Sequence, residues 1–188
     1  MLKLIAAPTA EPVTLAEVKG HAIIGHSLDD DLLSILISAA RAHGDGITGR
    51  RLASTTLEVV LDAFPSEIRL PGAPITELTS VKYIDVDGVE RVLDPSKYEA
   101  DIEGIKGRIV PVTSWPTISA TKLNSVRVRY VAGYTAETIP ADIRLWLLVR
   151  VSTLYAQRET MVVGGQVTEL GRNFVDCMLD PFIIPEGL

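Results

Sequence analysis

The feature that most constrains the fold is a long apolar helix expected in the last third of the chain. Pro140-Ala141-Asp142 opens it, and the periodicity predicts a helix over residues 140–160. Apolar residues cover nearly its whole circumference and leave only a narrow polar strip, made of Arg150, Thr153 and Gln157. A surface helix of a one-domain protein needs an apolar stripe on one side only. This helix is therefore expected to bury two faces, one on its own sheet and the other on a neighbouring subunit.

Several side chains of this helix are candidates for a subunit interface, namely Trp146, Leu147, Val149, Arg150 and Leu154. Trp146 is the leading candidate, because tryptophan is enriched among the residues that dominate binding at interfaces. Packing of Trp146 in the core of its own subunit explains the sequence equally well. The sequence leaves both interpretations open.

Two shorter helices are expected near the N-terminus, over residues 14–25 and 28–46. Thr14 and Glu17 have the spacing of a capping box, in which each side chain accepts a hydrogen bond from the backbone amide of the other residue. Asp29-Asp30-Asp31 follows Ser27 and favours the positive end of a second helix dipole. The apolar stripe predicted for the second helix is Leu32, Ile35, Leu36, Ala39 and Ala40. Together the two segments predict a helical hairpin.

Between residues 54 and 134 the apolar period changes to two, which predicts an antiparallel sheet of about five strands. Asp87-Gly88 joins two alternating segments and is a strong hairpin signal. Residues 71–74 and 114–117 are rich in proline and are expected to be surface loops. Arg127 and Arg129 share one face of a strand. They favour pairing with acidic residues on neighbouring strands, and a small basic patch is the alternative.

No residue pattern in this sequence predicts catalysis, a cofactor or a metal. Gly44 to Gly49 matches G-x-G-x-x-G, but it follows a helix and precedes a strand, so it favours a helix end over a dinucleotide site. The acidic run 29–31 is explained by the helix dipole and lacks the spacing of a calcium loop. The histidines have no zinc-type spacing and are expected on the surface or in helix packing, at His21, His26 and His43.

Composition excludes several classes of protein. A chain of 188 residues is long enough for one good core. The net charge of −6 disfavours a nonspecific grip on nucleic acid, which needs clustered lysine and arginine. Cys177 is the single cysteine, so an internal disulfide is impossible, and it is expected to pack as a small apolar residue. No apolar stretch approaches membrane length, and the expected setting is cytoplasmic.

The end of the chain is predicted to be an extended tail, residues 164–188, with a short helix beyond Gly164-Gly165. Its apolar residues lack a core of their own and are expected to need a partner: Phe174, Met178, Leu179, Phe182, Ile183 and Ile184. The predicted fold is α+β, a single domain over residues 1–163. It is a helical bundle, formed by the N-terminal hairpin and the long C-terminal helix, with an inserted antiparallel β-region.

The order of many short segments resembles the phage gp6-like head-tail connector proteins. The segments that carry the resemblance cover nearly the whole chain and are 12–19, 29–33, 39–42, 48–50, 61–65, 68–71, 81–85, 108–111, 114–116, 126–134 and 155–165. The most specific is Val131-Ala132-Gly133-Tyr134 followed by a helix that a proline opens. Gly44 and Gly46 depart from the family, whose members continue the helix there.

This resemblance implies a non-enzymatic structural protein of a tailed phage or of a gene transfer agent, made in the host bacterial cytoplasm. In such a particle the chain forms a ring of about twelve copies under the portal protein. The ring extends the DNA channel, joins head to tail and offers a platform to a downstream neck or stopper protein. Double-stranded DNA passes through without specific binding, no membrane is involved, and the tail is expected to dock on the portal. The alternative is a non-catalytic module that binds a small molecule or a peptide.

Overall fold

The structure is a computed structural model that describes residues 1–119, 122–157 and 175–185. The chain divides into two compact units. The sheet unit comprises Met1–Thr9 and Ala53–Gly133, and the helical unit comprises Ala10–Leu52 and Tyr134–Leu188. This division differs from the predicted single domain over 1–163 with a separate tail. The mixed α+β class is as predicted.

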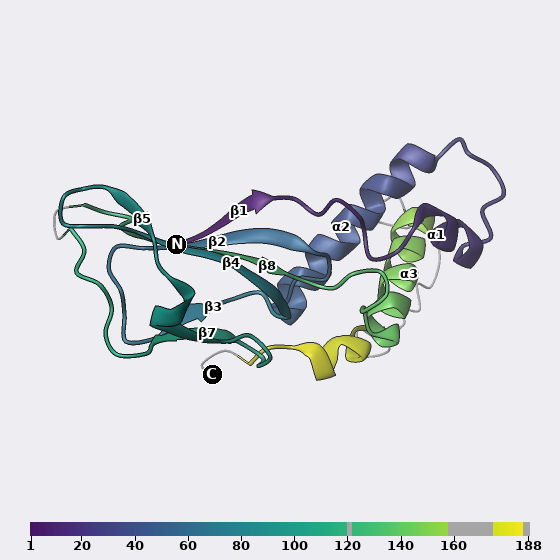
Figure 1. The fold of residues 1–188 in the computed structure, drawn as a ribbon. Helices are drawn as coiled ribbons and strands as arrows, with labels where there is room; N and C mark the ends of the chain where they lie inside the picture. Colours follow the sequence, from purple (N-terminus) through teal and green to yellow (C-terminus); the bar gives the residue numbers. More distant parts are fainter. Residues whose placement is uncertain (120–121, 158–174, 186–188) are drawn as a thin grey trace. The chain divides into compact units, whose positions relative to one another are not determined.

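The helical unit is built from three α-helices and a short 3-10 helix, within the described residues (Figure 1). They are α1 (Leu15–His21), α2 (Asp30–Thr48), α3 (Ala141–Ala156) and η2 (Asp176–Phe182). Their shared core includes Val18 of α1, Leu33 and Ile37 of α2, Trp146 of α3 and Leu179 of η2. The capping box of α1 is present as predicted, because the Thr14 side chain accepts from the Glu17 amide and Glu17 accepts from the Thr14 amide.

Helix α2 differs from its prediction in its buried face and in its end. Leu33, Ile37 and Ala40 are buried, whereas Ile35 of the predicted stripe is 63% exposed. The stripe was misplaced because this helix is rich in apolar residues on more than one side. The helix also continues past Gly44 and Gly46 and ends at Gly49, whose φ of 69° is the left-handed conformation that glycine adopts readily.

The sheet unit contains a five-stranded antiparallel sheet in the order β1-β2-β8-β4-β5. Its strands are β1 (Leu2–Ala6), β2 (Thr55–Leu61), β8 (Val126–Ala132), β4 (Ile75–Ile84) and β5 (Glu90–Val92). A second sheet has the order β3-β7-β6, with strands Ile68–Leu70, Gly107–Pro111 and Tyr98–Asp101, and η1 (Pro95–Lys97) precedes β6. Leu57 and Tyr130 of the first sheet share a core with Ile68 and Ile109 of the second.

The predicted hairpin joins β4 to β5, but its turn is longer than two residues and is organised by Asp85. The Asp85 carboxylate accepts hydrogen bonds from the amides of Asp87 and Val89 at 3.0 and 2.9 Å, and from Arg91 Nε at 2.5 Å. These bonds hold the pKa of Asp85 below its ordinary value. Gly88 adopts a φ of 81° within the turn.

The loop at 71–74 is more buried than the sequence predicts, whereas the loop at 114–117 is a surface loop, with Ser114 and Thr117 exposed. Ala73 is 1% exposed, and the carbonyl of Pro71 accepts a hydrogen bond from the buried Tyr130 hydroxyl at 2.8 Å. Trp115 stacks on Phe64 with ring centroids 4.6 Å apart and packs on the core of the sheet unit. The inward contacts are therefore made by single groups of these loops, the Ala73 side chain, the Pro71 carbonyl and the Trp115 ring.

Candidate interaction surfaces

Trp146 lies inside the helical unit. Its side chain is 0% exposed, and its indole N–H donates to Asp176 Oδ1 at 3.0 Å. The His43 ring packs beside it, with centroids 6.0 Å apart and a tilt of 54°. A Cβ added to Gly44 would lie 3.1 Å from Trp146 Cζ3, so the glycine leaves room for the indole. Of the two interpretations open in the sequence, core packing is the one that this geometry matches.

The other residues predicted for a subunit interface fall into two groups. Leu147 is 0% exposed and belongs to the core with Trp146. Val149, Arg150 and Leu154 are partly exposed. On the same helix Leu145 is 42% exposed, although the prediction did not include it. These four partly or largely exposed residues, Leu145, Val149, Arg150 and Leu154, are here called the α3 patch; Leu145 and Val149 are one helical turn apart, as are Arg150 and Leu154.

Arg150 is distinctive within the α3 patch. Its Nε atom is buried and has no hydrogen-bond partner among the residues that the structure describes. Arg144, one helical turn earlier, donates instead to the Glu17 carboxylate and to the Ala136 carbonyl. A buried N–H of a charged group without an acceptor lowers stability.

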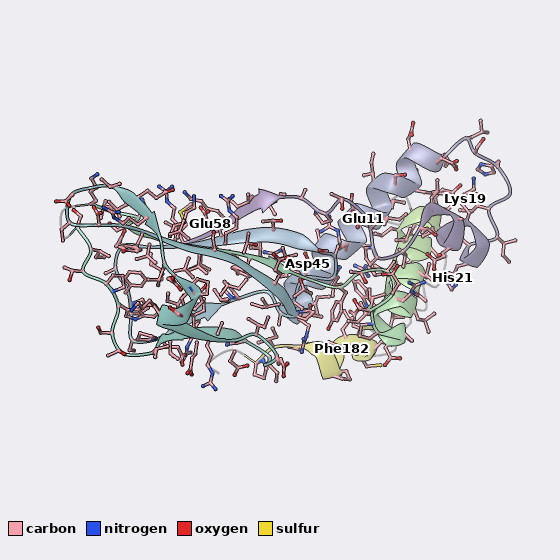
Figure 2. All side chains as sticks on the ribbon, viewed as in Figure 1. Glu11, Lys19, His21, Asp45, Glu58 and Phe182 are labelled. Atoms are coloured by element: carbon pink, nitrogen blue, oxygen red, sulfur yellow. The ribbon has the colours of Figure 1, made fainter. Side chains whose placement is uncertain are left out.

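Several of the tail residues predicted to need a partner protein pack instead on the core of the helical unit. Leu179 is 0% exposed, and Met178 and Phe182 pack on the same core. The amide of Ile184 donates to the Thr48 carbonyl at 2.9 Å, and the Phe182 carbonyl accepts from Arg50 Nε at 2.6 Å (Phe182 is labelled in Figure 2). Ile183 is 41% exposed, and Phe174 lies outside the described residues. The prediction of an apolar segment without a core is therefore wrong for residues 178, 179 and 182.

Acidic residues at the start of α2 bind other helices rather than cap the helix. Asp29 is the N-cap residue but makes no side-chain capping bond, and its Oδ2 accepts from the Tyr155 hydroxyl at 2.5 Å. Asp30 pairs with Lys19 of α1 at 2.7 Å. Two carboxylates of the acidic run therefore connect the start of α2 to α3 and to α1. In the described part of the chain, no three histidine, cysteine or carboxylate side chains are grouped so as to hold a metal ion.

One face of the five-stranded sheet carries a ladder of paired charges. Arg129 of β8 lies 2.9 Å from Glu58 of β2, the residue directly opposite it (Glu58 is labelled in Figure 2). Arg127 and Lys82 both approach Glu90, at 3.5 and 3.0 Å. The predicted cross-strand pairing of the two arginines is therefore confirmed. On this face Lys82, Arg127 and Arg129 are each engaged by a carboxylate.

The two edges of the same sheet expose apolar side chains. At the β1 edge, Leu4 is 62% and Ile5 is 42% exposed. At the β5 edge, Val92 is 65% and Val89 is 50% exposed. Strand β1 was not predicted, because five terminal residues with no buried member carry no alternating pattern. Edge strands with exposed apolar residues readily pair with another chain.

Comparisons with known proteins show which fold this is. No family model matches the chain, and no curated protein matches its sequence. Among solved structures, a chain in the "Neck of empty GTA particle computed with C6 symmetry" superposes with a TM-score of 0.82 at 21% identity, covering 100% of this chain and 97% of that one.

Two further solved structures contain a chain of the same fold. One is described as "Virion of native gene transfer agent (GTA) particle", with a TM-score of 0.81 at 20% identity. The other is described as "Neck of native GTA particle computed with C12 symmetry", with a TM-score of 0.79 at 21% identity. In both, the match covers 100% of this chain and 97% of the neighbour. No helix in the described ranges is long and apolar enough to cross a membrane.

Proposed function

We propose that this chain is a structural protein of the neck of a tailed phage or gene transfer agent. The observation that carries the proposal is a whole-chain fold similarity, with a TM-score of 0.82 over 100% of the chain, to a chain from a gene transfer agent neck. The resemblance of the sequence to the gp6-like head-tail connector proteins also indicates the neck of such a particle. A role without catalysis is consistent with the polar contacts described above, which cap a helix at Thr14, pair charges across strands at Arg129 and Glu58, and organise a turn at Asp85.

The specific role is that of a head-tail connector of the gp6-like kind. About twelve copies form a ring under the portal protein, extend the DNA channel, and give a downstream neck or stopper protein its platform. The symmetry of the neighbouring necks, C6 and C12, is that of a ring with repeated copies. The net charge of −6 suits a channel that double-stranded DNA traverses without adhering.

The α3 patch is the proposed surface for a neighbouring subunit in this ring. Val149 and Leu154 supply partly exposed apolar area, and Arg150 supplies a buried N–H that lacks an acceptor among the described residues. A carboxylate from the next copy would pair with the guanidinium of Arg150 and fix the register of the two subunits. Trp146 and Leu147 contribute from inside by holding α3 in place.

The portal is the proposed partner of the exposed part of the tail. Ile183 presents an exposed apolar side chain, while Leu179 anchors the same segment in the helical unit. Deletion of residues 172–188 would open the core of the helical unit, so point substitution is the cleaner test. Ile183→Asp should leave the fold unchanged and reduce co-purification with portal particles. Leu179→Asp serves as the contrasting variant, because it should unfold the helical unit.

Electron microscopy of particles that contain this chain tests the whole proposal. We expect a closed ring of density between portal and tail into which both units fit. Particles that lack this chain should retain the portal and lose the tail attachment. If the chain is absent from the neck of complete particles, or is found only in another part of the particle, the proposed function is wrong.

A further inference from the structure

The five-stranded sheet has a strand edge at each end to which no further strand is hydrogen-bonded in the described part of the chain. In the described part of the chain, β1 and β5 are the outermost strands of the five-stranded sheet. They lie at opposite ends of its strand order, so one copy carries two different edges. A ring needs such a pair of unlike surfaces, because each copy meets its two neighbours through different faces.

Hydrogen bonding shows which backbone groups of β1 point outward. Met1 and Val60 exchange two bonds, each 2.8 Å long, between the amino group or amide of one and the carbonyl of the other. Bonded and non-bonded pairs alternate along an antiparallel ladder. Lys3, opposite Glu58, is therefore the next bonded residue. Leu2 and Leu4 accordingly direct their N–H and C=O groups away from β2.

Strand β5 also directs the backbone groups of alternate residues outward. The Leu93 amide donates to the Val81 carbonyl at 2.8 Å, and the Asp85 amide donates to the Val89 carbonyl at 3.0 Å. Between these two bonded positions, Glu90 and Val92 fall at the non-bonded pairs of the β4–β5 ladder. Their N–H and C=O groups therefore point away from β4. Each edge therefore has two residues, Leu2 and Leu4 in β1 and Glu90 and Val92 in β5, whose backbone N–H and C=O groups point outward.

The direction of pairing follows from the topology. Every neighbouring pair in the order β1-β2-β8-β4-β5 is antiparallel, so β1 and β5 run in the same direction. In a ring of many copies the small rotation between neighbours barely changes the direction of a strand. The β5 edge of one copy would therefore meet the β1 edge of the next as a parallel pair.

The side chains select one register for this pair. Residues directly opposite each other in register point to the same face of a sheet. Lys3 lies opposite Glu58, Glu58 lies opposite Arg129, and Arg127, two residues from Arg129, lies opposite Lys82. Lys3 is therefore on the face that carries the charge ladder. Glu90 lies on that face too, since its carboxylate binds Lys82. Setting Lys3 beside Glu90 of the next copy joins opposite charges. Two residues further along, it sets exposed Ile5, which lies at the register shift of β1 between Leu4 and Ala6, beside exposed Val92.

We propose that β1 of each copy pairs in parallel with β5 of the next copy, so that one continuous sheet passes from subunit to subunit around the ring. The Leu4 amide donates to the Glu90 carbonyl of the next copy, and the Leu4 carbonyl accepts from the Val92 amide. This pairing rests on the proposed function, because it needs a ring of copies. It adds a second intersubunit contact to the α3 patch.

Cysteine cross-linking in assembled necks tests the pairing. The variant Ile5→Cys/Val92→Cys is made on a Cys177→Ser background, and the particles are oxidised and run on a denaturing gel. Adjacent residues on paired strands lie within disulfide reach. We expect a ladder of multimers that collapses to monomer on reduction. Ile35→Cys/Val92→Cys is the matched control, with exposures of 63% and 65%, and should give no ladder.

The single variants distinguish the other arrangements. Dimers from Ile5→Cys alone would mean that two β1 edges meet, which overturns the proposal. A neck in which the ring is visible but the double variant stays monomeric overturns the pairing and leaves the proposed function intact. Absence of the chain from the neck overturns both.

Hydrogen exchange of the unmodified protein gives a second measurement that needs no substitution. The amides of Leu4 and Val92 should exchange freely in the isolated chain and slow by about a hundredfold or more in the assembled neck. The Lys3 amide, which already faces β2, should change much less. Equal protection of Leu4 in the free and assembled states would overturn the proposal.

Discussion

The two units of this chain are held together in different ways. The sheet unit distributes its stability along backbone ladders and a core of many similar aliphatic side chains. The helical unit centres several of its contacts on one side chain, Trp146, which lies close to Gly44 of α2, bonds Asp176 of η2 and packs on His43. A distributed structure tolerates single changes, whereas a centred one depends on its central residue.

The largest expected effect is that of Trp146→Ala. Removing the indole leaves a cavity and removes the hydrogen bond that Asp176 Oδ1 accepts, so we expect the helical unit to lose about 4 kcal/mol. Trp115 is then the only tryptophan left, and its fluorescence reports on the sheet unit alone. Denaturation followed by helical circular dichroism should shift strongly, while the Trp115 signal should shift little.

If both signals move together by the same amount, the two units unfold as one and the contrast drawn above is wrong. Trp115→Ala is the matched control in the other unit. Trp115 is only half-buried, although its indole N–H donates to the Pro65 carbonyl at 2.6 Å. Trp115→Ala should lower the stability of the sheet unit by about 1–2 kcal/mol, less than Trp146→Ala lowers that of the helical unit.

A pair of glycines in α2 gives an intermediate effect with an internal control. A Cβ on Gly44 would lie 2.5 Å from Leu52 Cδ1, whereas nothing lies within 4 Å of one on Gly46. Gly44→Ala should destabilise the helical unit by about 1 kcal/mol, because crowding outweighs the gain in helix propensity. Gly46→Ala should stabilise it by a similar amount. Urea midpoints of the two variants measure both, and equal shifts would contradict a close approach at Gly44.

The smallest effect concerns pH. Hydrogen bonds from the Thr14 amide and hydroxyl hold the pKa of Glu17 below its ordinary value of 4.5, and Arg144 acts in the same direction. A lowered folded-state pKa stabilises the folded chain fully above pH 4.5 and ceases to do so as the pH falls through the folded value. Glu17→Gln keeps the cap but removes the charge, so it should flatten this part of the acid profile by about 0.5 kcal/mol.

Acid unfolding of the helical unit, followed by circular dichroism with and without Glu17→Gln, checks the sign. An unchanged slope below pH 4.5 would show that the carboxylate contributes nothing there. The sheet unit offers its own comparison at Asp85, whose pKa is also lowered, chiefly by its hydrogen bond with Arg91.

Local signals made much of this structure predictable. The Thr14 and Glu17 spacing located a helix start, the Asp87-Gly88 pair located a hairpin, and the alternation around Arg129 located a central strand with an acidic neighbour. Each of these depends on residues close in sequence or on a strict period. The structure agrees with all three.

What could not be predicted depends on distant contacts. The choice between core and surface for Trp146 was decided by Asp176, thirty residues later, and by the space at Gly44. Leu179 sits in a 3-10 helix whose burial comes from contacts with the core that α2 and α3 also line. The edge strand β1 pairs with residues fifty or more positions away. No periodic pattern in a short segment records such partners.

The burial of Leu179 bears on how the protein is made. Synthesis proceeds from the N-terminus, so α1, α2 and α3 leave the ribosome before the residue that closes their common core. Until then the site of Leu179 is open and the Trp146 indole lacks its acceptor. A chain that stops before Leu179 keeps that apolar site open and exposed to proteases, so η2 is the last element to complete the core of the helical unit.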